Sequence, residues 1–422
     1  MTRPPIKSIR SIMIVAGEAS GDMHGARLCA AICALAPDTR IFGMGGERMR
    51  AAGADLLADV SRRAGVGSTE LVSSLPELYR VYRGLREVLH QDPPSVLVLV
   101  DFPEFNLRLA GVARRLGIPV VYFVPPQIWV WRRWRIRPIR RRVSLVLAVF
   151  PFERALYADA GVPVEFVGHP VLDALGTAPS RHEARRALGV EDAPLVIGLL
   201  PGSRPGEASE LIPLMTAAAK RLRALRSHAR FLLAQAPTLD DEFIEEALAR
   251  TKGISVVKNA PAVIRASDLV LVASGTATLE TALLGTPMVV CYRVSRVSEL
   301  LARLLVRVPW INLVNLTLGR AAVPELRLRH ELTVERLVAE ASRLIESAEA
   351  RDHQLAAFAE LHGQLGERGV ALRAANIILG GGRILGGGLR PPSDAPRSPD
   401  GSLVAASPQD SDCAGQARAR TL

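Results

Sequence analysis

The chain lacks any long apolar segment. Apolar residues make up 49% of its 422 residues, yet no run of them approaches the roughly 18–20 residues that a membrane-spanning helix needs. Near the N-terminus a short apolar run, SIMIVA, leads directly into GEASGD. That order is typical of a first strand and its loop rather than of a signal peptide. We therefore predict a cytoplasmic protein without a membrane span.

Cysteine is also scarce, and no metal-binding pattern is present. None of the four cysteines has a second Cys or His at the spacing of a zinc site, so we expect free, mostly buried thiols. The motif DSD at 410–412 resembles the acidic motif of metal-dependent sugar transferases, but no strand precedes it. We predict neither a metal nor a cofactor. The cysteines are Cys29, Cys33, Cys291 and Cys413.

Two common phosphate-binding signatures are missing. The segment LLPGSRPGE (199–207) lacks the GK[ST] ending of a Walker loop. No G-x-G-x-x-G follows the first apolar run with an acid about 20 residues later, and GMGGERM (43–49) imitates that pattern only in part. These absences argue against a Walker-type NTPase and against an NAD enzyme.

What the sequence does contain is a regular alternation of short apolar runs and helical stretches. Continuous apolar strands between helices predict parallel sheets that helices cover on both faces. The expected fold is therefore α/β, with two doubly wound Rossmann-like domains facing across a cleft. The runs occupy residues 11–17, 39–45, 96–101, 119–125, 145–151 and 164–170, and then 195–202, 230–236, 254–258, 269–274 and 287–293.

Changes in composition suggest where these domains begin and end. A less apolar, charged stretch separates the two sets of strands, and the residues after Leu379 are rich in glycine, proline and polar side chains. Such a composition is typical of a disordered tail. The predicted parts are a first domain (1–174), a linker (175–194), a second domain (195–350), a C-terminal helix (351–379) and a tail (380–422).

Two loops in the second half could bind phosphate. Ligands of doubly wound sheets lie beyond the carboxyl ends of the strands, where strand-to-helix loops begin. In LLPGSRPGE, Gly202 allows a tight turn, and Ser203 and Arg204 stand at a helix start, where free N–H groups and a guanidinium can hold an anion. A plain turn with a surface arginine explains this loop equally well.

The other loop is VASGTATLETALLGTP (272–287). After Ser274 and Gly275, Thr276 and Thr278 could cap a helix, and Glu280 could accept the two hydroxyls of a ribose. The alternative is a capping box, in which Thr and Glu serve only the helix end. Two such loops in one half favour a nucleotide.

Acidic residues end two strands in the first half. Asp101 follows the run VLVLV, where partial burial would raise its pKa and suit it to act as a general base. The alternative is an N-cap for a helix at 104–116. In AGEASGDMHG (16–25), helix capping would explain one or two of Glu18, Ser20, Asp22 and His24, but not all four.

The segment 122–142 carries seven arginines, three of the four tryptophans and no acid, in a chain of net charge +11. So concentrated a charge indicates an anionic partner. No nucleic-acid-binding motif surrounds it, so we predict no nucleic acid. An anionic membrane surface is the other candidate partner, with most of the arginines exposed and Ile136 at the interface. Trp129 and Trp131 could serve the site or the core. The predicted patch is Trp134, Arg137, Arg140, Arg141 and Arg142.

Taken together, nine motifs between about residues 11 and 330 resemble those of the lipid-A-disaccharide synthases. Their order along the chain also matches that family, and the set is far more specific than any one motif. They are VAGEASGD, GMGGERM, DFPEFN, VPPQIWVWR, FPFE, VGHP, LLPGSR, ASGTATLE and NLTLGR.

The resemblance implies a GT-B glycosyltransferase whose final helix crosses back to the first domain. It implies inverting transfer of 2,3-diacylglucosamine from UDP to 2,3-diacylglucosamine 1-phosphate, giving a β-1,6 link, on the inner face of the inner membrane. It assigns catalysis to Asp101 and Arg204, with Glu18 as the other possible base. Nucleotide binding is expected of Gly202, Ser203, Arg204, Ser274, Gly275, Thr276, Glu280 and Asn315, and acceptor binding of Gly17, Glu18, Ser20, Gly21, Asp22, Gln127 and Trp129.

The sequence departs from the family at two places. Ser68 and Thr69 are polar where the family is usually apolar, and Val314 stands where a proline is usual. Two rivals stay open: another GT-B UDP-sugar enzyme, such as an epimerase or a transferase with a soluble acceptor, or a basic protein that binds RNA or membranes.

Overall fold

The computed structural model describes residues 9–59, 75–128, 133–293, 310–327 and 330–380. All of them belong to one unit that spans residues 1–389. The segment 66–72 with Ser68 and Thr69, the residues Trp129 and Trp131, and the tail lie outside the described residues. The predicted domain boundaries remain predictions.

The first sheet has seven parallel strands in the order β3-β2-β1-β4-β5-β6-β7, the doubly wound order. The strands β1 and β4 at its centre are buried along almost their whole length, which explains why they read as unbroken apolar runs. The strands are β1 (Ser11–Ala16), β2 (Arg40–Gly45), β3 (Asp55–Asp59), β4 (Val96–Val100), β5 (Val120–Phe123), β6 (Leu145–Ala148) and β7 (Val164–Phe166).

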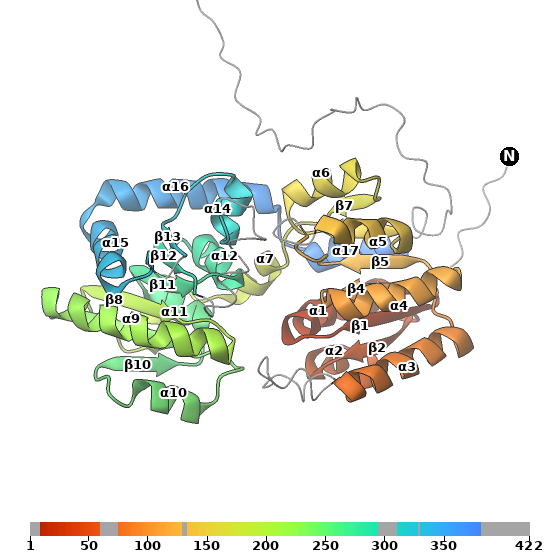
Figure 1. Cartoon of the computed structure of the whole chain (residues 1–422), viewed down its shortest axis with the longest axis horizontal. Coiled ribbons are helices and arrows are strands. Elements are labelled where there is room, and N and C mark those ends of the chain that lie inside the picture. Colours follow the sequence, from red (N-terminus) through yellow and green to blue (C-terminus); the bar gives the residue numbers. More distant parts are fainter. Residues whose placement is uncertain (1–8, 60–74, 129–132, 294–309, 328–329, 381–422) are drawn as a thin grey trace, which may run out of the picture. The chain divides into compact units, whose positions relative to one another are not determined.

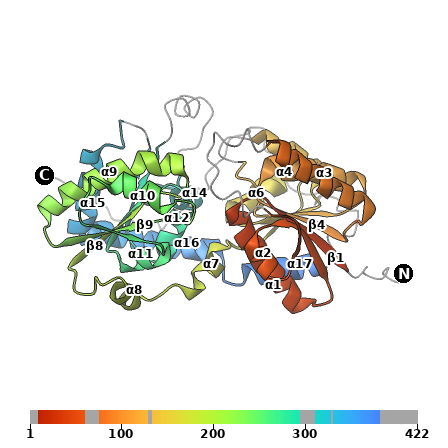
Figure 2. The ribbon, with the colours of Figure 1, turned by 90° about the horizontal axis from the view of Figure 1, so that it is seen from below.

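Helices cover both faces of this sheet (Figure 2). The helices α1 and α17 (Val370–Leu379) pack on one face, and α3, α4 and α5 pack on the other. The helices are α1 (Ala19–Leu35), α2 (Glu47–Ala51), α3 (Leu75–Gln91), α4 (Pro103–Arg115), the 3₁₀ turn η2 (Arg133–Arg135), α5 (Ile136–Arg142), α6 (Pro151–Asp159) and α7 (Val171–Ala174).

The second sheet has six parallel strands in the order β10-β9-β8-β11-β12-β13 (Figure 1). They are β8 (Leu195–Leu200), β9 (Ala229–Ala234), β10 (Ile254–Val257), β11 (Leu269–Ala273), β12 (Met288–Cys291) and β13 (Glu325–Leu326). The helices of this part are α8 (Arg181–Ala187), α9 (Pro205–Leu225), α10 (Asp241–Leu248), α11 (Ala260–Ala266), α12 (Thr276–Leu283), α14 (Leu313–Leu318), α15 (Val334–Glu346) and α16 (Ala348–Leu365).

The prediction of two doubly wound parallel sheets is thus confirmed. Two short strands, β3 and β13, were not predicted. The thiols of Cys29 and Cys291 are free and buried, as expected, whereas Cys33 is half-buried.

The stretch predicted as a linker (175–194) carries a helix, α8, that packs on α11. Its charged residues were part of the basis for predicting a linker. Two of them, Arg181 and Arg185, instead form ion pairs with Asp268, which lies just before β11. The charge in this stretch is therefore used to attach it to the second sheet.

The predicted C-terminal helix is two helices, α16 and α17 (Val370–Leu379), separated by a break at Gly366 to Gly369. Both glycines have left-handed backbone angles, with φ of 87° and 86°, which end one helix and redirect the chain. After the break α17 packs on α1, so the expected return of the chain to the first sheet is confirmed.

Side chains from the end of the first sheet fix this return. The carboxylate of Asp173 accepts hydrogen bonds from the N–H groups of Gly369 (2.6 Å) and Ala371 (3.2 Å), which caps α17. Arg373 donates from Nε to the carbonyl of Val167 (3.0 Å). The position of α17 is therefore fixed by hydrogen bonds as well as by apolar packing.

Candidate functional site

Asp101 lies in a strained turn at the carboxyl end of β4. Asp101 and Phe102 have φ of 49° and 47°, left-handed values that cost non-glycine residues about 1–3 kcal/mol each. The N-cap of α4 is Phe102, without a side-chain cap, so the alternative that Asp101 caps this helix is wrong. The carboxylate of Asp101 takes a hydrogen bond from the N–H of Phe102 and does not serve as the helix cap.

The surroundings of Asp101 change its acidity. Burial raises the pKa of its carboxyl group, against the opposing effects of the Phe102 N–H and the positive charge of Arg204. A carboxylate with a raised pKa is a better proton acceptor near neutral pH. The electrostatics therefore suit the predicted role of a general base.

Glu18 stands at the N-cap position of α1 but makes no side-chain cap. Although part of the side chain faces solvent, desolvation by the surrounding protein raises its pKa, and the negative charge of Asp101 raises it further. Arg204 opposes both effects. Glu18 and Asp101 are thus electrostatically coupled, and both remain candidates for the base.

Asp22 has a structural task that the sequence did not suggest. Its buried carboxylate accepts hydrogen bonds from the N–H groups of Gly46 (2.7 Å), Met49 (3.1 Å) and Arg48 (3.2 Å), and so caps α2. Capping thus accounts for one of the four polar residues of this loop, but on a different helix. These contacts occupy Asp22, which does not favour direct acceptor binding.

The glycines of the same loop are required by close packing. A side chain at Gly17 would place its Cβ 2.0 Å from the ring of Phe102, and at Gly21 a Cβ would lie 3.3 Å from that of Ala16. Ser20 is exposed in the first turn of α1. The loop is therefore fitted tightly against the Asp101–Phe102 turn.

Arg204 occupies the N-cap position of α9, a helix of 21 residues. Gly202 before it has φ of 100°, and the carbonyl of Ser203 between them accepts a hydrogen bond from the hydroxyl of Thr238. Within the part of the chain that the structure describes, Arg204 has no ion pair. Its exposed guanidinium and the helix N-terminus together form an anion-binding arrangement.

Glu207 is a neighbour of this loop that the sequence analysis missed. A Cβ at Gly202 would lie 2.4 Å from Oε2 of Glu207, so the carboxylate lies directly against this turn. Burial raises the pKa of Glu207, and the charge of Arg204 partly offsets that effect. An acid in the first turn of a helix is so common that the sequence alone does not single it out.

The second loop is not a capping box. The N-cap of α12 is Gly275, and the hydroxyl of Thr278 donates back to its carbonyl (2.7 Å), while Thr276 is exposed. Burial alone raises the pKa of Glu280, and no other described residue forms a hydrogen bond with its carboxylate. Glu280 can therefore accept hydroxyl groups from a ligand. Ser274, half-buried, directly follows β11, the strand before this helix.

Asn315 is fully engaged within the fold. Its side-chain oxygen accepts from the N–H groups of Ala322 (2.8 Å) and Val323 (2.9 Å), and its Nδ2 donates to the carbonyl of Val323 (3.0 Å). Its role as a direct nucleotide ligand stays a prediction, which these contacts do not favour. Val314, the departure from the family pattern, is completely buried in α14.

The basic segment divides into exposed and buried arginines. Trp134 is 66% exposed, and Arg137, Arg140 and Arg141 are exposed around it. Arg142 is half-buried and donates to the carbonyl of Leu107 (2.9 Å).

Arg135 is an exception to the expectation that most arginines of this stretch are exposed. Its side chain is buried and forms an ion pair with Glu104. Ile136 is half-buried and packs against the core of the first sheet, so its place at an interface stays a prediction. Gln127 is exposed just before the undescribed residues 129–132.

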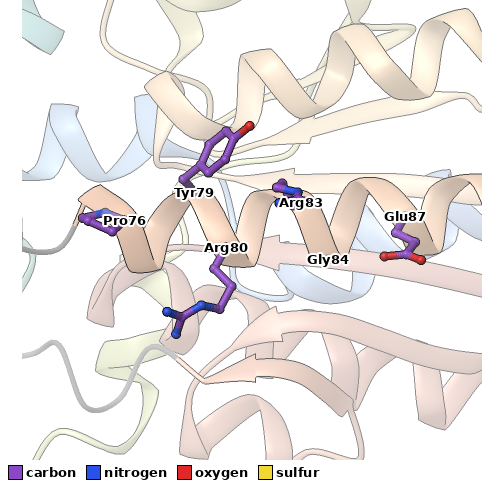
Figure 3. Close-up of a pocket in the computed structure, with 6 residues that line it drawn as sticks. All are labelled: Pro76, Tyr79, Arg80, Arg83, Gly84 and Glu87. Carbon is purple, nitrogen blue, oxygen red and sulfur yellow. The ribbon is translucent and has the colours of Figure 1, made fainter.

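A pocket of about 400 Å³ lies on α3, apart from the predicted site (Figure 3). It is lined by Pro76, Tyr79, Arg80, Arg83, Gly84 and Glu87. In the described part of the chain no three His, Cys, Asp or Glu side chains gather as metal ligands would.

Similarity to known proteins extends over nearly the whole chain. Residues 12–376 match the family model described as lipid-A-disaccharide synthetase. The lipid-A-disaccharide synthase of Myxococcus xanthus is 44% identical over 385 residues, which cover 90% of this chain and 98% of that protein. That of Syntrophus aciditrophicus is 41% identical over 371 residues, with coverages of 87% and 97%.

Solved structures resemble the chain in fold. A UDP-GlcNAc 2-epimerase from Neisseria meningitidis bound to UDP-GlcNAc aligns with a TM-score of 0.58 at 13% identity, over 88% of this chain and 98% of that one. Acinetobacter baumannii MurG aligns with a TM-score of 0.55 at 14% identity, over 87% and 99%. These likenesses confirm the predicted GT-B fold. The family match and the identities above 40% show that the chain belongs to the lipid-A-disaccharide synthase family of glycosyltransferases.

Proposed function

We propose that this chain joins 2,3-diacylglucosamine from its UDP derivative to 2,3-diacylglucosamine 1-phosphate through a β-1,6 link, with inversion and release of UDP. The observation that carries the proposal is that one chain of this family fold holds both a candidate general base and a candidate cationic group for the leaving diphosphate. A partly buried carboxylate with a raised pKa ends β4, and an arginine without an ion pair among the described residues begins α9. An inverting transfer needs one of each.

In the proposed reaction Asp101 accepts the proton of the acceptor 6-hydroxyl. The acceptor oxygen attacks C1 of the donor sugar from the face opposite UDP, and the bond between C1 and the diphosphate oxygen breaks. The proton ends on the carboxylate and the electron pair on UDP. Glu18, coupled to Asp101, is the alternative base, and the loop around Gly17, Ser20 and Gly21 contributes to the acceptor side.

The second sheet serves the nucleotide in this proposal. Arg204 and the N-terminus of α9, with Gly202 and Ser203, compensate the negative charge that grows on the diphosphate as it leaves. The turn at Ser274, Gly275 and Thr276 faces phosphate, and Glu280 accepts the ribose hydroxyls.

Substrates with acyl chains reside at a membrane, which suggests a cytoplasmic enzyme bound to the inner face of the inner membrane. None of the described helices is long and apolar enough to cross a membrane. The proposed contact is therefore peripheral, through Trp134, Arg137, Arg140 and Arg141 on anionic head groups. Arg142 belonged to the predicted patch but is left out here, because its guanidinium donates a hydrogen bond to the carbonyl of Leu107.

Replacing Arg137, Arg140 and Arg141 with Ser tests this contact. Each arginine near an anionic surface contributes about 1 kcal/mol, less as salt screens it. The triple variant should leave anionic vesicles at moderate salt yet keep its activity on detergent-dispersed substrate.

A matched control removes the same charge from the second sheet, where Arg186, Arg230 and Arg250 are exposed. Equal vesicle binding by both triple variants would contradict the membrane patch. Loss of RNA binding instead would favour the nucleic-acid alternative.

The reaction is tested by incubating the purified protein with both acylated substrates and identifying the products by mass spectrometry. Release of UDP together with a disaccharide is expected. Conversion of the donor alone would favour an epimerase, and transfer to a deacylated acceptor at equal rate would favour a soluble acceptor. If neither UDP nor a disaccharide is formed, the proposal is refuted.

A further inference from the structure

We propose that Asn106 and Tyr122 are positioning residues that hold the Asp101–Phe102 turn, and with it the base, in its left-handed conformation. The inference rests on the proposed function, in which Asp101 is the base. It assigns a role to two completely buried polar side chains that the reaction itself does not use.

The turn needs external support because its conformation is unfavourable. Asp101 and Phe102 are consecutive non-glycine residues with φ near +50°. Such a conformation persists only where the surrounding structure enforces it, and it is concentrated at functional sites. The neighbouring strand β5 is likewise followed by a left-handed residue, Val124, with φ of 54°. The strained residues therefore lie together at the carboxyl ends of two neighbouring strands.

Two side chains donate hydrogen bonds to the same backbone carbonyl, that of Asp101. The hydroxyl of Tyr122 lies 2.8 Å from this oxygen, and Nδ2 of Asn106 lies 2.6 Å from it. Asn106 reaches the turn from α4, and Tyr122 reaches it from β5, beside β4 in the sheet. The carbonyl is thus held from two different elements.

Asn106 links the turn to the two central strands as well. Its Nδ2 also lies 3.2 Å from the carbonyl of Val100 and 3.4 Å from that of Val15. The side-chain oxygen, by contrast, is buried with no hydrogen-bond partner among the described residues. An amide kept in the interior with an unsatisfied oxygen indicates that its donor group is what the site requires.

The other side of the turn is held by aromatic packing. The ring of Phe102 lies on Gly17 and stacks on Phe105, with centroids 5.5 Å apart and planes at 23°. Phe105 in turn meets Tyr82 of α3 edge-on, with centroids 5.8 Å apart. With its carbonyl and the next ring both fixed, the Cα–Cβ direction of Asp101 has little freedom.

Removing one hydrogen bond should let the turn relax and the carboxylate move toward water. The rate should fall more than substrate affinity, because the base acts only in the transition state. Greater hydration should lower the pKa of Asp101, so the acid limb of the pH–rate profile should move to lower pH. The charged or titratable groups facing Asp101 are Glu18, Glu104, Arg204 and Tyr122 itself.

The test is Tyr122→Phe, which deletes one hydroxyl and keeps the ring. We expect kcat to fall roughly tenfold, KM to change less than about threefold, and the acid limb to move down. Asn106→Ala should act in the same direction. Thr286→Val is the matched control, because it deletes a buried hydroxyl that donates to the carbonyl of Ile264 (2.9 Å) away from this turn. It should lower the melting temperature without moving the profile.

A double-mutant cycle separates this inference from the proposed function. If Tyr122 acts through Asp101, adding Tyr122→Phe to Asp101→Asn should cause no further loss of residual activity. An equal loss in both backgrounds, or an unchanged kcat and profile in Tyr122→Phe, overturns the positioning role alone. Near-normal turnover of Asp101→Asn overturns the base assignment, and the positioning role with it.

Discussion

The loops at the carboxyl ends of the two sheets differ in how far their polar groups are already satisfied. The Asp101 turn of the first sheet is strained, and hydrogen bonds from Asn106 and Tyr122 hold it. In the second sheet Arg204 has no ion pair and Glu280 no hydrogen-bond partner among the described residues, and Gly275 supplies no side-chain cap. The first region is built before any ligand binds, whereas the second retains unused donors and acceptors.

This difference matches what each region does in the proposed reaction. A proton acceptor must be held within a fraction of an ångström of the attacking hydroxyl, so its support is part of the fold. Groups that bind a diphosphate and a ribose must instead exchange water for ligand, so they cannot be satisfied by the protein beforehand. Mutations in the two regions should therefore impair the enzyme in different ways.

The largest effect is expected for Asp101→Asn. The amide cannot accept the proton, so turnover should fall by roughly 10²–10⁴ while UDP affinity is unchanged. Steady-state kinetics and UDP titration measure the two quantities. Glu18→Gln is the companion variant, because its carboxyl is coupled to that of Asp101. A greater loss in Glu18→Gln than in Asp101→Asn would transfer the role of base to Glu18.

Arg204→Ala comes next, with an expected loss of roughly 10²–10³ in kcat/KM, because charge on the leaving diphosphate grows in the transition state. Donor affinity should fall as well, and Lys should restore activity only in part because it lacks the planar fork. Equal activity of the wild-type and Ala proteins would refute this role.

The same variant should shift the pH–rate profile in a known direction. The charge of Arg204 lowers the pKa of both Glu18 and Asp101, so removing it should raise both. The base would then lose its proton only at higher pH, and the acid limb should move up. Tyr122→Phe should move it down, so the two variants distinguish a charge effect from a positional one.

The strand ends were predictable from the sequence, but the side chains that support them were not. Asp101 and Ser274 each follow an unbroken apolar run, and such runs mark buried parallel strands whatever lies around them. Asn106, by contrast, looks like any polar residue of a helix, and Tyr122 like a core aromatic. Their role depends on contacts with a carbonyl on another element, which no local pattern encodes.

The contacts of Asp22 and Arg185 were missed for the same physical reason. Asp22 caps a helix that begins 25 residues later, and Arg185 pairs with Asp268, 83 residues away. Local spacing predicts local caps, and it carries no information on partners this far along the chain. The strands β3 and β13 were missed because DLLAD begins and ends with an acid that disfavours strands, and β13 has only two residues.

A smaller effect is expected for Glu280→Gln. If the carboxylate accepts ribose hydroxyls, the neutral amide should lose about 1.5–3 kcal/mol of binding, or roughly ten- to hundredfold in UDP affinity. The ribose is remote from the breaking bond, so kcat should change little. Calorimetry with UDP measures the effect, and Glu246→Gln on exposed α10 removes the same charge as a control. A fall in kcat at unchanged UDP affinity would contradict the assignment.

The smallest effect on activity, but a clear one on stability, is expected at Glu153, a buried carboxyl of the first sheet outside the proposed site. Its Oε2 accepts from the N–H groups of Val149 (2.9 Å) and Phe150 (3.1 Å), while Oε1 is buried without a partner among the described residues. Burial raises the pKa of Glu153 from 4.5 to about 8. Glu153 therefore tests what burial alone does to a carboxyl group that has no role in the proposed reaction.

The sign of the pH effect follows from that shift. Between pH 4.5 and about 8 the unfolded chain releases the Glu153 proton while the folded chain retains it, so stability is lost as pH rises, by up to about 1.4 kcal/mol per pH unit. The buried His24 and His169 act oppositely, because burial lowers their pKa values from 6.5 to about 4 and about 3, and their contribution is lost as pH falls below 6.5. Measurements above pH 7 therefore isolate the effect of Glu153.

Glu153→Gln resembles the neutral acid and cannot ionise. Its melting temperature should therefore rise relative to that of the wild type between pH 7 and 8, and the two curves should run parallel above pH 9. Curves that are parallel throughout would show that this carboxyl is already ionised in the folded protein, and that burial at the first sheet does not by itself hold a proton.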